Sequence, residues 1–293
     1  MSVWVVVANY GDTRVTRRAV AAILSSTVRP ECVLVIDNQG DLPDFSEDGV
    51  EVVRPGSNLG FGGACGLGIR RALADGAGWV WFVNNDAEPE RSCLGELLAA
   101  GAAEPRAGIL SPVIVHSGGT GFWFAGGDLV RRSLQVTHRP QPACETPHDV
   151  GFVTGCAWLV RREFIEECGP LDASLFMYFE DVDWSLRAQA AGWRTLLVPA
   201  ARAVHDARYE HGRRVFSPLA IYFMTRNRLL LARRWGSPSV AFAASISWGA
   251  RQLVKCRSAA AAARVTVAVS AGLWHGVTGR RGPAPAGLAR RLR

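Results

Sequence analysis

The sequence predicts an α/β fold, with a mainly parallel sheet flanked by helices and a basic helical appendage at the C-terminal end. Three observations support this fold class. Strand-like and helix-like segments alternate through the N-terminal third of the chain, and polar residues follow the ends of several predicted strands. Residues 211–293 are rich in alanine, have a helical pattern and contain no Asp or Glu. With 293 residues and 48% hydrophobic content, the chain can bury a substantial core.

The first predicted element is a strand over Val3–Ala8, a continuous apolar run that is typical of a strand buried on both faces. The next elements alternate: helix Thr13–Ser26, strand Val33–Ile36, strand Glu51–Arg54, helix Phe61–Gly76, strand Trp79–Val83 and helix Leu94–Ala103. Ligands of such sheets bind beyond the carboxyl ends of the strands, so the polar residues found there are candidates for a site.

The middle of the chain predicts shorter strands around glycine-rich turns. These elements are strands at Ile109–Val115, Phe122–Ala125, Val130, Phe152–Arg161 and Trp193–Pro199, a loop at Pro140–Asp149, and helices at Glu163–Cys168 and Phe179–Ala191. From Ser217 onward the pattern is helical. The longest uncharged stretches there, Trp235–Ala250 and Val265–Gly279, are shorter than the ~20 residues that span a bilayer. We interpret them as helices lying on a membrane surface, the alternative being a helical lid packed on the core.

Charge is divided unevenly along the chain. Residues 1–210 hold all 26 acidic and 18 of the 33 basic residues, a net charge of −8, whereas residues 211–293 hold 15 basic residues, a net charge of +15. Such a segment suits an anionic partner, either a lipid surface or a phosphorylated substrate. It has few interleaved aromatic residues and no recognition motif, which argues against nucleic acid.

The sequence predicts a cytoplasmic protein. Its seven cysteines form no CxxC pair and suggest no disulfide framework. The first residues, Met1 to Val7, lack the basic start and cleavage site of a signal peptide.

Two acidic motifs carry the chemistry. Asn84-Asn85-Asp86 follows an apolar run, and Glu180-Asp181 lies where a helix is expected to begin. A carboxylate at the end of a buried strand can hold a metal ion against a diphosphate, and a second carboxylate can take a proton from a hydroxyl group. Together they predict group transfer from an activated, phosphate-bearing donor. The alternatives are a simple turn at Asp86 and favourable electrostatics of acids in a first helical turn at Glu180 and Asp181.

Two further segments suit a nucleotide. Asp37 ends a predicted parallel strand, where its carboxylate can accept a hydrogen bond from a base or a ribose hydroxyl; the alternative is an Asx turn. The segment from Asn58 to Gly63 places glycines at a helix start, where backbone can approach a ligand closely. It is not the dinucleotide-binding GxGxxG motif, because Cys65 occupies the third glycine position. An ordinary helix N-terminus is the alternative there.

The ordered set of motifs resembles the family 2 glycosyltransferases of the GT-A fold, and within them the rhamnosyltransferase-like branch. The resemblance covers roughly residues 3–230 and rests on these motifs: Ala8-Asn9-Tyr10, Val35 to Asn38, Asn58 to Gly63, Asn84 to Asp86, Gly155-Cys156-Ala157, Phe176 to Arg187, and Tyr222 to Asn227. Asn84 stands where the family's metal-binding motif has its first carboxylate, so Asp86 is the retained acid.

The resemblance implies a role for each candidate residue. Nucleotide-sugar contacts fall on Ala8, Asn9, Tyr10, Asp37, Asn58, Gly60, Phe61, Gly62, Asn84 and Asn85. The acceptor side falls on Gly155, Cys156, Tyr222 and Arg226, where Arg226 either contacts a pyrophosphate or is a solvated helix arginine. Asp86 binds Mg²⁺ or Mn²⁺, with His205 as a further ligand, and Asp181 is the general base, with Glu180 as the fallback.

The resemblance also predicts domains and partners. Residues 1–215 would form the catalytic domain, with 1–105 the nucleotide-binding half and 106–215 the acceptor half, followed by a helical region at 216–279 and a disordered basic tail at 280–293. The expected reaction is inverting transfer from dTDP-rhamnose or another dTDP- or UDP-sugar to a hydroxyl acceptor, either a lipid-linked glycan or a natural-product scaffold. Peripheral contact with the inner face of the cell membrane is expected, and homodimerisation is left open.

Two other functions remain as alternatives. A non-catalytic protein that binds nucleotide-sugars would keep the donor site and lack turnover. A sugar-nucleotide nucleotidyltransferase would need a Gly-rich, arginine-bearing loop after the first strand, and the segment from Asn9 to Asp12 does not provide one.

Overall fold

The computed structural model describes residues 2–118, 121–205, 209–210, 213–214 and 216–292. The chain divides into two compact units. The sheet unit comprises residues 1–128, 137–171 and 181–207, and the helical unit comprises residues 129–136, 172–180 and 208–293. Two internal segments that the sequence grouped with the sheet, 129–136 and 172–180, therefore belong with the C-terminal helices.

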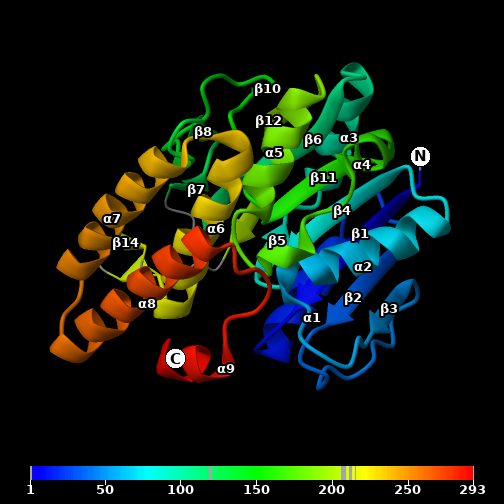
Figure 1. The fold of residues 1–293 in the computed structure, drawn as a ribbon. Coiled ribbons are helices and arrows are strands. Elements are labelled where there is room, and N and C mark those ends of the chain that lie inside the picture. Colours follow the sequence, from blue (N-terminus) through cyan, green and yellow to red (C-terminus); the bar gives the residue numbers. More distant parts are fainter. Residues whose placement is uncertain (1, 119–120, 206–208, 211–212, 215, 293) are drawn as a thin grey trace. The chain divides into compact units, whose positions relative to one another are not determined.

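The sheet unit is built on a ten-stranded sheet with the order β10-β12-β6-β11-β4-β1-β2-β3, in which β5 pairs with β12 and β7 pairs with β6 (Figure 1). The strands are β1 (Val3–Asn9), β2 (Cys32–Asp37), β3 (Val50–Val53), β4 (Trp79–Asn84), β5 (Ala87–Pro89), β6 (Ala107–His116), β7 (Phe122–Phe124), β10 (His148–Asp149), β11 (Ala157–Arg161) and β12 (Arg194–His205).

The N-terminal strands β3, β2, β1 and β4 are parallel. Strand β11 inserts antiparallel between β4 and β6, and β12 runs parallel to β6. Asn9 at the end of β1 pairs with Asp37 at the end of β2, and Ala8 pairs with Asn84 at the end of β4. The parallel register thus places three polar strand ends at one edge of the sheet, as the sequence predicted.

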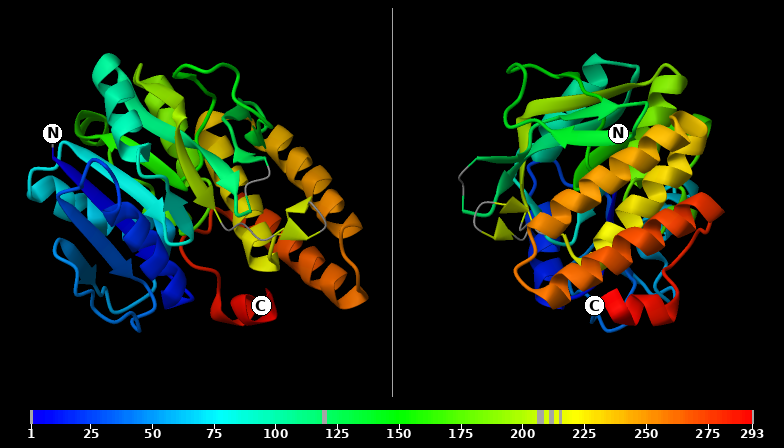
Figure 2. Two further views of the ribbon diagram at one scale, coloured as in Figure 1. Left: turned by 180° about the vertical axis from the view of Figure 1, so that it is seen from behind. Right: turned by 60° about the vertical axis from the view of Figure 1, so that its left-hand side comes forward.

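Helices cover both faces of this sheet (Figures 1 and 2). They are α1 (Thr13–Leu24), α2 (Gly60–Ala74), α3 (Cys93–Ala103), α4 (Arg162–Cys168) and α5 (Glu180–Ala190). A Cβ added at Gly68 of α2 would lie 2.5 Å from the side chain of Val6, and one at Gly101 of α3 would lie 2.6 Å from Trp79. Val6 and Trp79 point to opposite faces of the sheet, because successive side chains alternate along paired strands. Glycine at these two positions therefore lets α2 and α3 lie close against opposite faces.

The helical unit contains α6 (Pro218–Trp235), α7 (Pro238–Val254), α8 (Ala259–Thr278), α9 (Ala286–Leu292) and the 3₁₀ helix η1 (Ala173–Leu175). Ser217 and Ser258 cap α6 and α8, since each hydroxyl accepts a hydrogen bond from a backbone N–H three residues later. Two short pairs of strands complete the fold: β8 (Gly127–Val130) with β9 (Gln135–His138), and β13 (Tyr209–Glu210) with β14 (Arg213–Arg214). Within the described ranges, no helix combines the length and the apolar character needed to cross a bilayer.

The predicted disorder of the basic tail is wrong for residues 280–292. The backbone N–H of Gly282 donates to the carbonyl of Ser174 at 2.7 Å, and Arg281 forms an ion pair with Asp172 at 3.0 Å. Leu292 at the end of α9 is buried in an apolar cluster with Ile221 and Val265. These contacts with distant parts of the chain order a segment whose composition by itself predicts disorder.

Other differences concern short strands and strand ends. The sequence missed β5 and β9, β11 begins only at Ala157, and the strand predicted to stop at Pro199 continues to His205. The extension of β12 matters for the site, because its last residues pair with β5.

We predict that Gly68→Ala lowers the free energy of unfolding by about 1–3 kcal/mol, because the new methyl group would overlap Val6 in the packed layer between α2 and β1. Urea denaturation followed by circular dichroism measures this change. Gly66→Ala in the same helix is the control: the nearest atom there is the tip of Arg70 at 3.8 Å, so helix propensity should leave stability unchanged or raise it by up to about 1 kcal/mol. Equal losses in both variants would contradict the close approach at Gly68.

Candidate functional site

A network of hydrogen bonds joins the polar ends of β1, β2 and β4. The Nδ2 group of Asn9 donates to Oδ1 of Asp37 at 2.8 Å, and the hydroxyl of Thr16 donates to Oδ1 of Asn9 at 2.6 Å. The Nδ2 group of Asn85 reaches back to Thr16 at 3.1 Å and to the carbonyl of Tyr10 at 3.3 Å. These polar contacts, of which those of Asn9 are buried, join the three strand ends. Thr16 takes part in them and is a residue that sequence reasoning missed.

Asp37 is 1% exposed and is held by its own loop. Its carboxylate accepts hydrogen bonds from the backbone N–H groups of Gln39 at 3.2 Å and Leu42 at 2.9 Å. Burial by itself would raise the pKa of Asp37, but these bonds and the one from Asn9 outweigh it, so the pKa lies below its usual value. The contact with Gln39 is the Asx turn that the sequence left as the alternative. Contact with a nucleotide base stays a prediction.

The glycine-rich segment begins α2. The side chain of Asn58 accepts from the N–H of Gly60 at 2.8 Å, and the side chain of Asn38 accepts from the N–H of Leu59 at 3.1 Å. Gly60 has a positive φ of 71°, a conformation that favours glycine. Phe61 packs against Gly155, where an added Cβ would lie 3.3 Å from the phenyl ring. The predicted donor residues of this segment therefore lie beside a residue predicted for the acceptor side.

Asp86 and His205 are brought together by an element that the sequence did not predict. Strand β5 begins directly after Asp86 and pairs antiparallel with the end of β12, so that Ala87 lies opposite His205. As a result, Nε2 of His205 lies 3.1 Å from Oδ1 of Asp86. The imidazole is 7% exposed and packs against Trp123, with 4.6 Å between the ring centroids.

This pair can contribute two ligands to a divalent cation. The described residues contain no cluster of three or more His, Cys, Asp or Glu side chains that could enclose a metal ion. A carboxylate oxygen and an imidazole nitrogen on one side suit a cation that takes its remaining ligands from a diphosphate and water. Nε2 of His205 is the nitrogen that faces the carboxylate of Asp86. Nδ1 is buried and makes no hydrogen bond to a described residue.

Asp181 lies in the first turn of α5 and is tied to the segment that precedes β11. Its Oδ1 accepts from the N–H of Val182 at 2.8 Å, and its Oδ2 accepts from the N–H of Gly155 at 3.4 Å. The next residue, Cys156, accepts through its carbonyl a hydrogen bond of 2.7 Å from the N–H of Asn84. Asp181 is therefore linked through Gly155 and Cys156 to the strand end that Asp86 follows.

The two acids at the start of α5 differ in exposure. Glu180 is 6% exposed, whereas Asp181 is partly exposed. A general base must reach a proton on an incoming substrate, so the geometry favours Asp181 over Glu180.

The segment before α5, within the helical unit, has an unusual backbone. Phe176, Tyr178 and Phe179 have φ angles of 66°, 67° and 73°, which cost energy for residues with large side chains. The Nδ2 group of Asn227 donates to the carbonyls of Leu175 at 3.0 Å, Met177 at 2.8 Å and Tyr178 at 2.8 Å. This single amide thus stabilises a strained segment that leads directly into Glu180 and Asp181.

Arg226 and Tyr222 are enclosed in the helical unit. Arg226 is fully buried, and its guanidinium donates to the carbonyls of Leu175 at 2.7 Å and Gly282 at 2.6 Å. Burial lowers the pKa of this guanidinium. The hydroxyl of Tyr222 lies 2.9 Å from Nδ1 of His275. The contacts of Arg226 support the backbone at Leu175 and Gly282. The sequence predicted either a pyrophosphate contact or a solvated side chain for Arg226, and these buried contacts are neither. Acceptor contact at these two residues stays a prediction.

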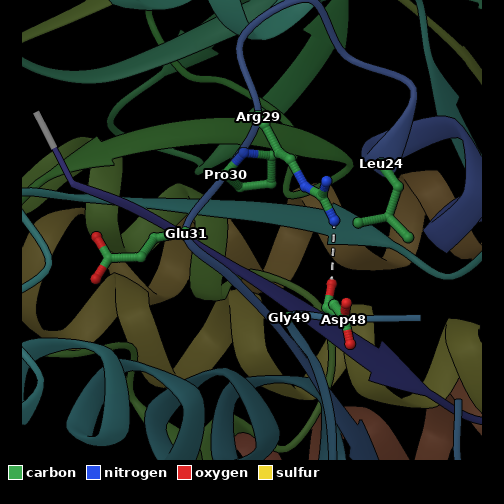
Figure 3. A pocket seen from close by; sticks show the side chains of 6 residues that line it. All are labelled: Leu24, Arg29, Pro30, Glu31, Asp48 and Gly49. Carbon is green, nitrogen blue, oxygen red and sulfur yellow. Dashed lines mark hydrogen bonds between the residues drawn. The ribbon is translucent and has the colours of Figure 1, made fainter. Parts of the chain in front are cut away.

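A surface hollow of about 480 Å³ lies elsewhere, near the amino ends of β2 and β3 (Figure 3). Its lining residues are Leu24, Arg29, Pro30, Glu31, Asp48 and Gly49. None of the predicted site residues lines it, and the amino ends of parallel strands are opposite to the edge where ligands of such sheets bind.

Known proteins resemble this chain along most of its length. The family model described as "Glycosyl transferase family 2" matches residues 4–169. The chain is 29% identical over 261 residues to the N-acetylglucosaminyl-diphospho-decaprenol L-rhamnosyltransferase of Mycobacterium tuberculosis, which covers 79% of this chain and 85% of that protein. It is 24% identical over 229 residues to the dTDP-rhamnosyl transferase RfbF of Shigella flexneri, covering 73% of this chain and 75% of that protein.

Among solved structures, the fold resembles that of GalNAc-T7 crystallised with UDP, GalNAc and Mn²⁺, with a TM-score of 0.63 and 18% identity. The alignment covers 80% of this chain and 48% of the other, so this chain spans about half of that protein. The likeness confirms the GT-A fold that the sequence predicted.

We predict that Asn227→Ala lowers the free energy of unfolding by about 1–3 kcal/mol, because three carbonyls of the strained segment lose a shared donor. Hydrogen–deuterium exchange should show faster exchange of the amides of residues 176–181. Ser270→Ala, an exposed serine of α8, is the control and should change neither quantity. Unchanged exchange in the Asn227 variant would show that the segment keeps its conformation without this amide.

Proposed function

Because the chain belongs to glycosyl transferase family 2 and is a glycosyltransferase with the GT-A fold, we propose that it transfers rhamnose from dTDP-rhamnose, or a related sugar from a dTDP- or UDP-sugar, to a hydroxyl group of its acceptor. The observation that carries this proposal is the chain of contacts from Asp181 through Gly155 and Cys156 to Asn84. It ties a partly exposed carboxylate to the strand end that bears Asp86.

In the proposed reaction, the carboxylate of Asp181 accepts the proton of the acceptor hydroxyl as the hydroxyl oxygen bonds to the anomeric carbon of the donor. The bond from that carbon to the diphosphate oxygen breaks on the opposite side. The products are a glycoside with inverted configuration and a nucleoside diphosphate. A divalent cation held by Asp86 and His205 would neutralise the negative charge that gathers on the leaving diphosphate.

The donor preference is supported by the relatives. Two of them are named as rhamnosyltransferases, and one of these is named for dTDP-rhamnose. We place the nucleotide at the carboxyl ends of the strands. The hydrogen-bond network of Asn9, Asp37 and Asn85 and the segment around Asn58 lie there.

For the acceptor, we favour a glycan linked to a polyprenyl diphosphate. The mycobacterial relative is named for an acceptor of this chemistry. The net charge of +15 over residues 211–293 suits both a diphosphate and an anionic membrane surface at which such an acceptor resides. A soluble natural-product scaffold is the alternative, which acceptor screening would separate.

We predict that Asp181→Asn lowers kcat by about 10²–10⁴-fold while nucleotide binding is retained, because the amide cannot take the proton of the acceptor. Release of the nucleoside diphosphate from dTDP-rhamnose in the presence of acceptor measures the rate. Glu180→Gln should cost less, and Glu163→Gln, an exposed acid in the first turn of α4, should leave the rate unchanged. Equal activity of wild type and Asp181→Asn would favour the non-catalytic nucleotide-sugar-binding protein.

We predict that dTDP or UDP raises the melting temperature only with Mg²⁺ or Mn²⁺, and that EDTA abolishes this shift. Asp86→Asn and His205→Gln should each reduce the shift, because the two side chains face the same position. Glu88→Gln is the matched control, since this acid of β5 lies two residues from Asp86 and pairs with Arg18 on the surface. Stabilisation by nucleotide of equal size in EDTA would argue against metal-assisted binding.

A further inference from the structure

We propose that the hairpin of α7 and α8 is a membrane-docking surface that binds a bilayer containing anionic phospholipids. The surface consists of two stripes of exposed apolar side chains and the basic residues beside them. The proposal extends the lipid-linked acceptor discussed above by naming the part of the chain that meets the bilayer. The docking itself does not depend on which sugar is transferred.

Exposed large apolar side chains gather on these two helices. On α7 they are Phe242, Ile246, Leu253 and Val254, and on α8 they are Val267, Trp274 and Val277. Val254 is 87% exposed and Trp274 is 67% exposed. The spacings follow the helical repeat, so each set forms a stripe along one side of its helix. Such stripes are typical of helices that lie in a membrane interface.

The closest packing within the helical unit is made by small residues. Helix α7 turns small buried residues, Ala241, Ser245 and Gly249, toward its neighbours, and a Cβ added at Gly249 would lie 2.9 Å from Val269 of α8. Helix α8 packs on α6 through Gly272 and Gly276 in the same way. The closest helix contacts thus use small residues, while Trp248, Val265 and Val269 pack inward and the apolar residues named above stay exposed.

Charge identifies the occupant of this surface. Arg251, Lys255, Arg257 and Arg264 are exposed around the connection between α7 and α8, and residues 211–293 contain no acidic residue. Basic residues next to an apolar stripe complement the anionic headgroups that border the acyl chains of a bilayer. A second copy of the same surface would instead bring two strongly basic segments together, which electrostatic repulsion opposes.

An exposed tryptophan of α8 also suits a membrane interface. Trp274 is the most exposed tryptophan side chain among the large apolar residues of the described chain. Tryptophan prefers the interface between headgroups and acyl chains, because its ring is largely apolar and its N–H can donate a hydrogen bond. Trp274 would therefore lie at the depth of the headgroups.

The test measures binding of the full chain to sedimented vesicles of phosphatidylcholine alone or with 30% phosphatidylglycerol, in low and high salt. We expect wild type to bind the anionic vesicles about tenfold or more tightly than the neutral ones, with weaker binding in high salt. The triple variant Ile246→Ser, Val254→Ser, Trp274→Ser should lose about tenfold or more in affinity. The double variant Arg251→Gln, Lys255→Gln should lose about tenfold for anionic vesicles only.

Matched controls carry the same changes on other surfaces. Val28→Ser with Val130→Ser replaces exposed apolar residues outside α7 and α8, and Arg70→Gln with Arg91→Gln removes two exposed charges. Both should bind like wild type. Melting curves check that every variant is folded. If the triple variant is destabilised, the charge variant still decides the question. So does quenching by brominated lipids that is seen in wild type and lost in Trp274→Phe, a comparison needed because the chain has ten tryptophans.

Equal vesicle binding by wild type and both docking variants would overturn the proposal. Wild type that binds no vesicles but forms a dimer, lost in the triple variant, would assign the surface to a second copy instead. Transfer to a short-chain, water-soluble prenyl diphosphate acceptor separates this result from the proposed function. The docking variants should keep that activity and lose transfer to acceptor embedded in vesicles, whereas absence of transfer by wild type would contradict only the proposed acceptor.

Discussion

The hydrogen bond from the N–H of Asn84 to the carbonyl of Cys156 is the contact on which the rest of the site depends. It continues the antiparallel pairing of β4 and β11 to the last residue of β4. Because of it, Gly155 lies where its N–H can reach the carboxylate of Asp181, while Asp86 follows β4 by two residues. Backbone pairing thus places Gly155, whose N–H donates to the carboxylate of Asp181, next to the strand end that Asp86 follows. Catalysis by a positioned base depends on such fixed geometry.

A second constraint concerns the backbone that enters α5. Three residues with large side chains adopt positive φ angles at positions 176, 178 and 179, and the helical unit compensates this cost with the donors of Asn227 and Arg226. Helix α6 therefore has a role beyond packing, since its Asn227 and Arg226 hold the backbone of residues 175–178, which precede α5 in the chain. Burial of Arg226 is tolerated because two backbone carbonyls and the side-chain oxygen of Asn227 accept hydrogen bonds from its guanidinium.

The C-terminal helices combine two properties that would conflict in an ordinary core. Their closest contacts use Gly249, Gly272 and Gly276, while Ile246, Val254 and Trp274 are exposed. Burial of large apolar side chains normally provides the main stabilisation of a helical unit. Here close approach of backbones through Gly249, Gly272 and Gly276 provides part of it, which leaves the large side chains available for a partner.

The sequence by itself determined the alternation of strands and helices, the polar strand ends at Asn9, Asp37 and Asp86, and the order of motifs that marks the family, because these features are local or depend only on the period of side chains along a strand. Tertiary structure decided the pairing of Asp86 with His205, since it requires the three-residue strand β5 to pair with β12 across more than a hundred residues of chain. It also decided that Arg226 and Asn227 hold a strained backbone, and that residues 280–292 are ordered, because their partners Leu175 and Ser174 are distant in sequence. Local pattern carries no information on which distant carbonyl will be within reach of a donor, and only the folded chain fixes that distance.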